Sequence, residues 1–555
     1  MSDQENRSTA HTGTHHSTHG ITHGSTTSGA HGRAHAYDTI IRHVCVEDGT
    51  GGASYLADVG LRDGRIVDIT PPEGLATARA DDEVYGRGLV LAPGFIDAHT
   101  HDDTVVIRHP DMLPKISQGV TSVIVGNCGI SAAPVRLRGA PPDPMNLLGD
   151  AAAFKYPRFA DYRDAVNAAA PSVNVAALIG HTALRNNHMD RLDRSADAAE
   201  IASMRSDLQE ALDGGALGLS TGLAYASANA CSTDEVKELA QILDAAGAVY
   251  TTHLRSEFEP ILEALDEAFD VGRHARAPVI VSHLKCAGAG NWGRSVEVLA
   301  SVERASRYQA VGCDCYPYSA SSSTLDLKQV TSDFPIKVTW STPHPEQGGK
   351  LLSDIAAEWG MSLMDAARAL QPAGAVYYGM DENDVQRILR HPLTMIGSDG
   401  LPDDPLPHPR LWGAFPRVLG HYSRDVGIFP LSTAVHKMTG LTARRFGLHE
   451  RGEIRSGYWA DLTLFDPATI ADTASFDQPV QAAAGIRSVW VNGVLSYRPD
   501  VVDGESSERG ADDVDSSAQA ASNAARSVAK PVGRAGRFLA RSGDLREGFA
   551  QLAGE

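Results

Sequence analysis

The chain has 555 residues, 42% of them hydrophobic, and a formal net charge of −20, which describes a globular protein larger than one ordinary domain. The acidity argues against nucleic acid or an anionic membrane as partner, because such surfaces are bound by clustered Lys and Arg. No apolar run reaches the ~18 residues that a membrane-spanning helix needs. The six cysteines include no CxxC pair and do not form the dense pattern of a disulfide-stapled domain.

Both ends of the chain are of low complexity. Residues 1–37 are rich in His, Gly, Ser and Thr without a periodic apolar face, so we predict a disordered His-rich tail and not a metal-binding element. The first residues have neither the basic nor the apolar region of a secretory signal, which favours a cytoplasmic location. Residues 498–555 form a second polar tail, and its weakly amphipathic stretch VGRAGRFLARSGDLREGFAQL is either mobile or docked as a helix.

Two segments that flank the centre alternate apolar and polar residues in short runs. Residues 38–92 contain IIRHVCVEDG and ADVGLRDGRIVDIT, and residues 448–497 contain GYWADLTLFDP and GIRSVWVNGVLSYRP. Short alternating runs broken by Gly and Asp are typical of antiparallel strands and turns. We therefore predict one small β-sandwich built from both ends of the chain.

Residues 93–447 repeat a unit of one apolar run followed by a stretch with helical periodicity. The runs are GFIDAHTH, VTSVIVGNCG, NVAALIGH, GALGLSTG, GAVYTTHLR, APVIVSHLK, AVGCDCYPY and LTMIGSDG. Eight continuous apolar strands that alternate with helices predict the α/β class and a closed (β/α)8 barrel of the TIM type. Residues 325–385 are too long for a plain connection, so we predict an insertion there that covers the site as a lid.

Reactive residues end most of the predicted barrel strands. A histidine or cysteine at one strand end is more often structural than functional, but barrel enzymes build their sites from the carboxyl ends of several strands. Histidines two apart on a strand share a face and can bind one cation. A nitrogen, sulfur and oxygen donor set suits Zn²⁺ better than Mg²⁺ or Ca²⁺. The predicted metal ligands are His99, His101, Cys128, His253, His283 and Asp399.

The motifs around these positions resemble those of the amidohydrolase superfamily and, within it, the D-aminoacylases, over residues 38–497. The resemblance is carried by PGFIDAHTHDD, QGVTSVIVGNCGIS, GALGLSTGLAY, THLRSE, SHLKCAGAGNWG, DCYPYSASSSTL and IGSDGLPDDPLPHPRLWGAFPRVLG. Many amidohydrolases use a carboxylated Lys on the fourth strand, and GALGLSTG has none. In the D-aminoacylases a cysteine ends the second strand instead, as Cys128 does here.

This resemblance implies zinc-dependent hydrolysis of a small N-acyl-D-amino acid to a carboxylate and a free D-amino acid. It implies a tightly bound zinc on Cys128, His253 and His283. His99, His101, Cys128 and Asp399 would surround a second, weaker zinc site. Asp399 would serve as general base and then general acid.

The substrate's oxyanion and carboxylate also need partners. Tyr225 is similar to the family tyrosine that stabilises the oxyanion, although AYASANA lacks the proline that often follows it. By resemblance, the substrate carboxylate is bound by Lys285, Arg410, Tyr316 and Ser322. GHTALR departs from the family pattern GHGTLR at Thr182, which puts the loop geometry there in doubt.

Two alternatives to this activity are open. A cyclic-amide hydrolase of the dihydropyrimidinase or dihydroorotase kind shares the barrel, but the absent fourth-strand Lys counts against it. A catalytically inactive barrel kept as a scaffold usually loses ligands, whereas all six predicted positions are occupied here. The preferred side chain, the number of zinc ions and the oligomeric state are not determined by the sequence. Cys231, Cys286, Cys313 and Cys315 are assigned to packing.

Overall fold

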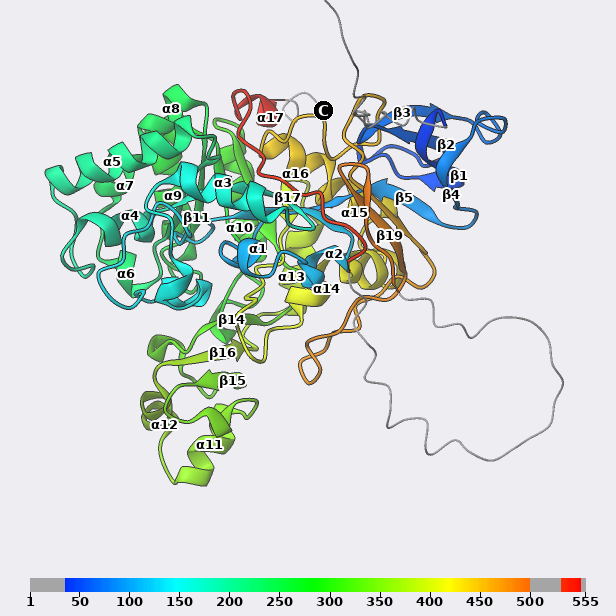
Figure 1. Ribbon diagram of the computed structural model, residues 1–555. Coiled ribbons are helices and arrows are strands. Elements are labelled where there is room, and N and C mark those ends of the chain that lie inside the picture. The colour runs from blue at the N-terminus through cyan, green and yellow to red at the C-terminus, as the bar shows by residue number, and fades with distance from the viewer. Residues whose placement is uncertain (1–34, 500–530, 551–555) are drawn as a thin grey trace, which may run out of the picture.

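The centre of the molecule is a closed barrel of parallel strands (Figure 1), in a computed structural model that describes residues 35–499 and 531–550. β6 to β8 form one parallel sheet, and β9 to β13 with β17 form another. Only Leu178 separates β8 from β9, and a parallel bridge from Thr100 to Gly400 joins the first strand to the last. The strands are β6 (Phe95–Asp97), β7 (Val120–Val125), β8 (Asn174–Ala177), β9 (Ile179–Gly180), β10 (Gly218–Gly222), β11 (Val249–His253), β12 (Val279–Val281), β13 (Val311–Cys315) and β17 (Thr394–Ile396).

These strands are buried along their whole length, as expected when both faces of a parallel sheet are covered. The eight predicted apolar runs all lie at barrel strands, and the predicted α/β barrel is confirmed. Aliphatic residues in or next to the barrel strands pack together in one buried cluster, which includes Ile124, Leu217 and Ile280.

Helices surround the barrel and turn one apolar stripe towards it. In α9 the buried positions include Ile261, Leu265 and Ala268, a spacing of four and three residues that places them on one helix face. α5 begins at a capping box formed by Asp197 and Glu200. The helices of this layer are α1 (Val105–Arg108), α2 (Leu113–Ile116), α3 (Phe159–Ala169), α4 (His181–His188), α5 (Ala198–Asp213), α6 (Ala226–Asn229), α7 (Thr233–Ala240), α8 (Ile242–Ala246), α9 (Ile261–Ala275), α10 (Ser295–Ser306), α13 (Glu382–Arg390), α14 (Arg410–Arg417), α15 (Leu431–Met438) and α16 (Gly440–Arg445).

A second, eight-stranded sheet combines strands from both ends of the chain. Its path runs β20-β19-β18-β5-β1-β2-β3, with β4 parallel to β1, and its buried residues form a separate core. In Figure 1 its early and late strands lie together beside the barrel. The strands are β1 (Tyr37–Val46), β2 (Tyr55–Arg62), β3 (Arg65–Thr70), β4 (Ala80–Tyr85), β5 (Val90–Pro93), β18 (Leu462–Phe465), β19 (Ile486–Val491) and β20 (Val494–Tyr497).

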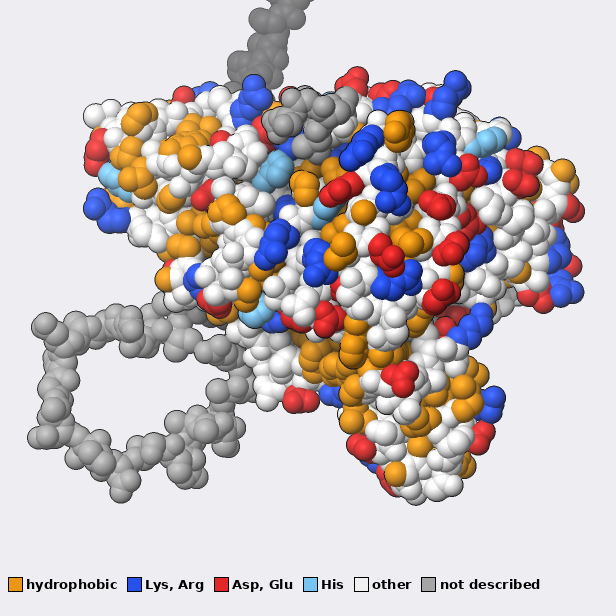
Figure 2. All heavy atoms as spheres, turned by 180° about the vertical axis from the view of Figure 1, so that it is seen from behind, with side chains coloured by type: hydrophobic (Ala, Val, Ile, Leu, Met, Phe, Trp, Pro, Cys, Tyr) orange, Lys and Arg blue, Asp and Glu red, His pale blue; other side chains and the backbone are white. Residues whose placement is uncertain are grey.

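A small subdomain lies between β13 and α13 and projects from one end of the barrel (Figure 1). Its antiparallel sheet has the order β14-β16-β15 and carries two amphipathic helices on its own apolar core. Figure 2 shows hydrophobic side chains where this subdomain meets the barrel. The elements are β14 (Ser321–Thr324), β15 (Ile336–Ser341), α11 (Leu352–Trp359), α12 (Leu363–Leu370) and β16 (Ala373–Tyr377).

Charged side chains of both signs are interspersed on the face shown in Figure 2, without one large basic patch. In the described part of the chain, no helix combines the length and the apolar character needed to cross a membrane. Apart from residues 35–37, the predicted His-rich tail lies outside the described residues.

Residues 531–550, from the predicted C-terminal tail, pack against the amino ends of the barrel strands. Val175 of β8 donates a backbone hydrogen bond to Arg537 and accepts one from Leu539, so this segment pairs with the edge of β8 near the start of that strand. Leu545 and Phe549, the latter in α17 (Glu547–Ala550), belong to the barrel's interior cluster. The segment therefore closes the amino-terminal mouth of the barrel.

Leu545→Ala is expected to lower the free energy of unfolding by about 2–5 kcal/mol, because Leu545 is 1% exposed and its loss leaves a cavity under the barrel. The matched control is Val532→Ala in the same segment, where a side chain 60% exposed should change stability by less than about 0.5 kcal/mol. Thermal or denaturant unfolding of both variants measures the difference. Equal effects would show that the segment does not contribute to the barrel core.

Candidate metal centre

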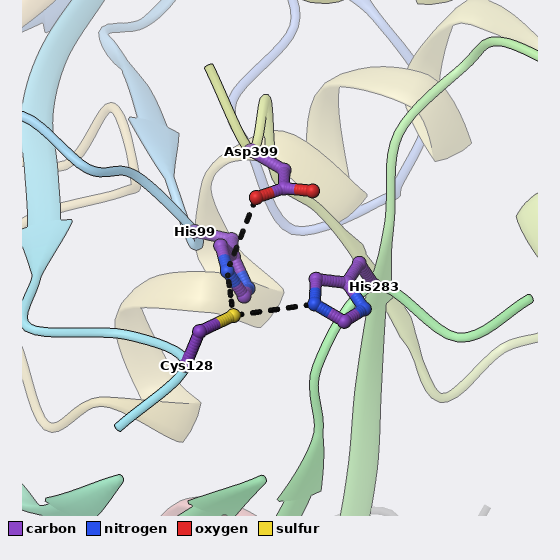
Figure 3. Close-up of side chains that lie close together, drawn as sticks. All are labelled: His99, Cys128, His283 and Asp399. Carbon is purple, nitrogen blue, oxygen red and sulfur yellow. Dashed lines mark hydrogen bonds and ion pairs between the residues drawn. The ribbon is translucent and has the colours of Figure 1, made fainter. Parts of the chain in front are cut away.

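The six predicted metal ligands lie together at the carboxyl ends of the barrel strands, and all are buried. The histidine pair follows β6, Cys128 follows β7 and His253 ends β11; His283 and Asp399 follow β12 and β17. Figure 3 shows four of them converging from different strands. One ligand atom from each of these four lies within 4.8 Å of the others: His99, Cys128, His283 and Asp399.

The thiol of Cys128 lies between two imidazoles. Its Sγ is 3.2 Å from Nε2 of His99 and 3.2 Å from Nε2 of His283. Asp399 Oδ1 lies 3.1 Å from Nε2 of His101 and 3.6 Å from Nε2 of His99. The ring of His253 is 4.4 Å from that of His283, centroid to centroid. The structure thus brings all six side chains into one cluster.

The backbone around the thiol is tightly constrained. Cys128 has a φ of 53°, a left-handed conformation that is uncommon outside glycine and is often found at functional sites. A Cβ at the following Gly129 would lie 2.6 Å from the backbone nitrogen of Gly222, so glycine is required there. Thr182, at the departure from the family pattern, donates its backbone N–H to Gly129 O at 2.8 Å, which ties α4 to the cysteine loop.

Charges in the cluster favour a thiolate. Burial opposes ionisation of Cys128, but His99 and His283 lower the pKa of its thiol well below the usual range. Burial raises the pKa of Cys286 to about 12 and that of Cys231 to about 11, so these thiols stay protonated at neutral pH. Cys128 is therefore chemically distinct from these packing cysteines.

Histidine and aspartate respond to the same field. Burial lowers the pKa of His101, but Asp399 and Cys128 more than offset this and raise it to about 9. Burial would raise the pKa of Asp399, yet Arg410 and the imidazoles hold it well below its usual range. Arg410 Nη1 lies 2.9 Å from Asp399 Oδ2. A thiolate, several imidazoles and a carboxylate form the donor set that suits Zn²⁺.

Two carboxylates that the sequence analysis did not single out support the histidines. Asp314 lies 3.3 Å from Nδ1 of His99 and accepts the backbone N–H of His283 at 2.9 Å. Glu257 Oε1 lies 3.0 Å from Nδ1 of His283. Both stand in motifs that carry the family resemblance, DCYPY and THLRSE, which is the signal that could have identified them.

A cavity of about 610 Å³ lies above the cluster, between the barrel and the small subdomain. His101, His253 and Asp399 form part of its floor, and Trp340 and Tyr377 of the subdomain line its outer part. This volume is within the usual range for small-molecule sites. The subdomain therefore contributes one side of the cavity, and its role as a lid stays a prediction.

The predicted substrate-binding residues fall into two groups. Tyr225, Lys285 and Ser322 line the cavity, and Ser322 Oγ is buried without a hydrogen-bond partner. Arg410 is fully buried and donates to Ser322 O at 3.0 Å, and the ring of Tyr316 lies 4.5 Å from its guanidinium carbon. Arg410 and Tyr316 are buried and do not line the cavity.

Another group of side chains that could bind a metal lies outside the cavity and consists of His181, Cys231 and Glu235. His181 Nε2 lies 3.0 Å from Glu235 Oε1, and Arg185 is bonded to the same oxygen. Arg255 contacts Cys231 Sγ at 3.9 Å. Two guanidinium groups disfavour a metal cation, so this group is an ion-pair network that joins α4 to α7.

The barrel with this cluster defines the class: residues 86–497 match the model of the amidohydrolase family, to which the chain belongs. It is 49% identical over 473 residues to a D-aminoacylase of Alcaligenes xylosoxydans xylosoxydans, covering 85% of this chain and 97% of that one. A D-aminoacylase crystal structure matches with a TM-score of 0.84 at 47% identity, over 91% of this chain and 100% of that one. An N-acyl-D-glutamate deacylase of Bordetella bronchiseptica, complexed with zinc and a phosphonate inhibitor, matches with a TM-score of 0.82 at 41% identity and the same coverage.

Proposed function

We propose that this protein hydrolyses the amide bond of N-acyl-D-amino acids, giving a carboxylate and a free D-amino acid, with Zn²⁺ as cofactor. The observation that carries the proposal is the buried thiolate, imidazole and carboxylate cluster beneath a cavity that also presents Lys285. The preference for the D-configuration is inferred from relatives that are 49% and 41% identical to this chain.

Cys128, His253 and His283 would hold the tightly bound zinc, and His99, His101, Cys128 and Asp399 would surround a weaker second site. When bound, Zn²⁺ supplies a Lewis acid that polarises the amide carbonyl and makes water easier to deprotonate near neutral pH. The low pKa of the Cys128 thiol supplies the anionic sulfur that such a site needs.

Asp399 moves the proton. Hydrolysis forms a C–O bond between water and the amide carbon and breaks the C–N bond, while one proton passes from water to the leaving nitrogen. Asp399 is ionised at neutral pH because of Arg410 and the imidazoles, so it can accept that proton and then donate it to the nitrogen.

Tyr225 and the cavity wall bind the rest of the substrate. Burial and the charge of Cys128 raise the pKa of Tyr225 well above 10, so its hydroxyl stays a donor for the developing oxyanion. Lys285 and Ser322 face the cavity and would bind the substrate carboxylate directly. Arg410 and Tyr316 would act from behind, by holding Asp399 and the wall of the cavity.

The test is an assay of purified protein with added zinc on N-acetyl-D-methionine, its L-enantiomer and N-acetyl-D-glutamate. We expect release of the free amino acid from D-substrates only. Activity on the L-form alone would contradict the stereochemical proposal, and turnover of hydantoin or dihydroorotate without N-acyl activity would favour a cyclic-amide hydrolase. A protein that holds no zinc and gains no activity from it would support the scaffold.

The cytoplasmic location stays a prediction of the sequence.

A further inference from the structure

Glu257 lies four residues after His253, in the loop between β11 and α9, and is 7% exposed. Its Oε1 is 3.0 Å from Nδ1 of His283 and also accepts a hydrogen bond from Nζ of Lys285. Lys285 Nζ lies in turn 2.8 Å from the same Nδ1. Carboxylate, ammonium and imidazole therefore meet at one point behind the metal centre.

The Glu257 carboxylate and the Lys285 ammonium, both close to Nδ1 of His283, influence which ring nitrogen of His283 carries the proton. Its Nε2 faces the thiol of Cys128 at 3.2 Å, so Nε2 must be free of its proton to bind zinc and the proton must reside on Nδ1. The ammonium of Lys285 can only donate, and a hydrogen bond from it to Nδ1 would move the imidazole proton to Nε2. An ionised carboxylate has no proton to donate and can only accept a hydrogen bond, so Glu257 favours the tautomer with the proton on Nδ1.

We propose that Glu257 is a positioning residue: it holds His283 in the Nδ1–H tautomer that can bind metal, and it draws the Lys285 ammonium away from Nδ1. This inference rests on the proposed zinc site. Glu257 is also close enough to His253 and His283 to act as a metal ligand itself. However, the Lys285 ammonium already occupies its Oε1, and a second cation there would be repelled.

The key experiment is a comparison of zinc dissociation constants, measured by chelator competition on the full chain, for Glu257→Gln and the wild type. Loss of an outer-shell partner is expected to weaken zinc binding by about 10–100-fold. The matched control is Glu235→Gln, which neutralises another buried glutamate bonded to a histidine and a cation. It should lower the unfolding temperature and leave zinc affinity unchanged.

A double variant separates positioning from general structural damage. In Glu257→Gln with Lys285→Met the competing donor is gone, so zinc affinity should return to within a few-fold of the Lys285→Met single variant. The inference is overturned if Glu257→Gln binds zinc as tightly as the wild type, or if the double variant shows no recovery. Should Glu257→Gln fail to fold, Glu257→Asp in the same two backgrounds provides the comparison. A wild type that binds no zinc would instead refute the proposed function.

Discussion

Replacing Asp399 with Asn is expected to lower kcat by about 10²–10⁴-fold, the usual contribution of a general acid and base, with KM changed little. The amide keeps the shape of the side chain but cannot accept the proton of water. Arg410 Nη1, 2.9 Å from the carboxylate, would then face a neutral group. Steady-state kinetics on an N-acetyl-D-amino acid, with zinc content measured on the same sample, checks the prediction.

The control for this variant is Asp403→Asn, four residues further along. Asp403 forms a part-exposed ion pair with Arg108, so the same chemical change should leave kcat within about twofold, as expected for a surface pair. An Asp399→Asn enzyme that keeps zinc and retains most of its kcat would assign the proton transfer to another group. A loss of zinc in parallel with kcat would instead identify Asp399 chiefly as a ligand.

Replacing His253 with Ala is expected to cost more zinc affinity and more activity than replacing His99 with Ala. His253 belongs to the proposed tightly bound set, and losing a ligand should exceed the about 10–100-fold that losing an outer-shell partner costs. His99 lies 3.2 Å from the Cys128 thiol. The comparison therefore decides which imidazole completes the tightly bound set with Cys128 and His283.

Zinc titration and kinetics on both variants, prepared metal-free and reloaded, provide the measurement. His274→Ala on the surface of α9 is a suitable control, because His274 is exposed and its ring nitrogen Nε2 is hydrogen-bonded to the side chain of Gln241. Equal losses for His253 and His99 would mean that the two sites are wrongly ranked. A larger loss for His99 would exchange the roles of the two histidines.

The barrel could be predicted from the sequence because its signals are local. Each strand is a continuous apolar run, and reactive residues such as Cys128 and His283 stand at fixed places after those runs. The carboxyl ends of parallel strands meet at one end of a barrel, so the ligands could be grouped before any contact was known.

The surroundings of the ligands could not be predicted in the same way. Glu257 contacts His283 across two strands, and a single sequence carries no record of such a pair. The burial of Arg410 against Asp399 and Ser322 depends on how α14 packs on the barrel. These positions are set by side-chain packing, which has no periodic signature along the chain.

The docking of residues 531–550 has a consequence for the order in which the chain folds. On the ribosome these residues are made after every barrel strand, and Leu545 and Phe549 complete the apolar interior that those strands begin. Until residues 531–550 have been made, the apolar interior at the amino ends of the barrel strands therefore lacks these two side chains. Translation that stops before residue 531 would give a barrel whose apolar interior is exposed at the amino ends of its strands. Chaperones and proteases recognise exposed apolar surfaces of this kind.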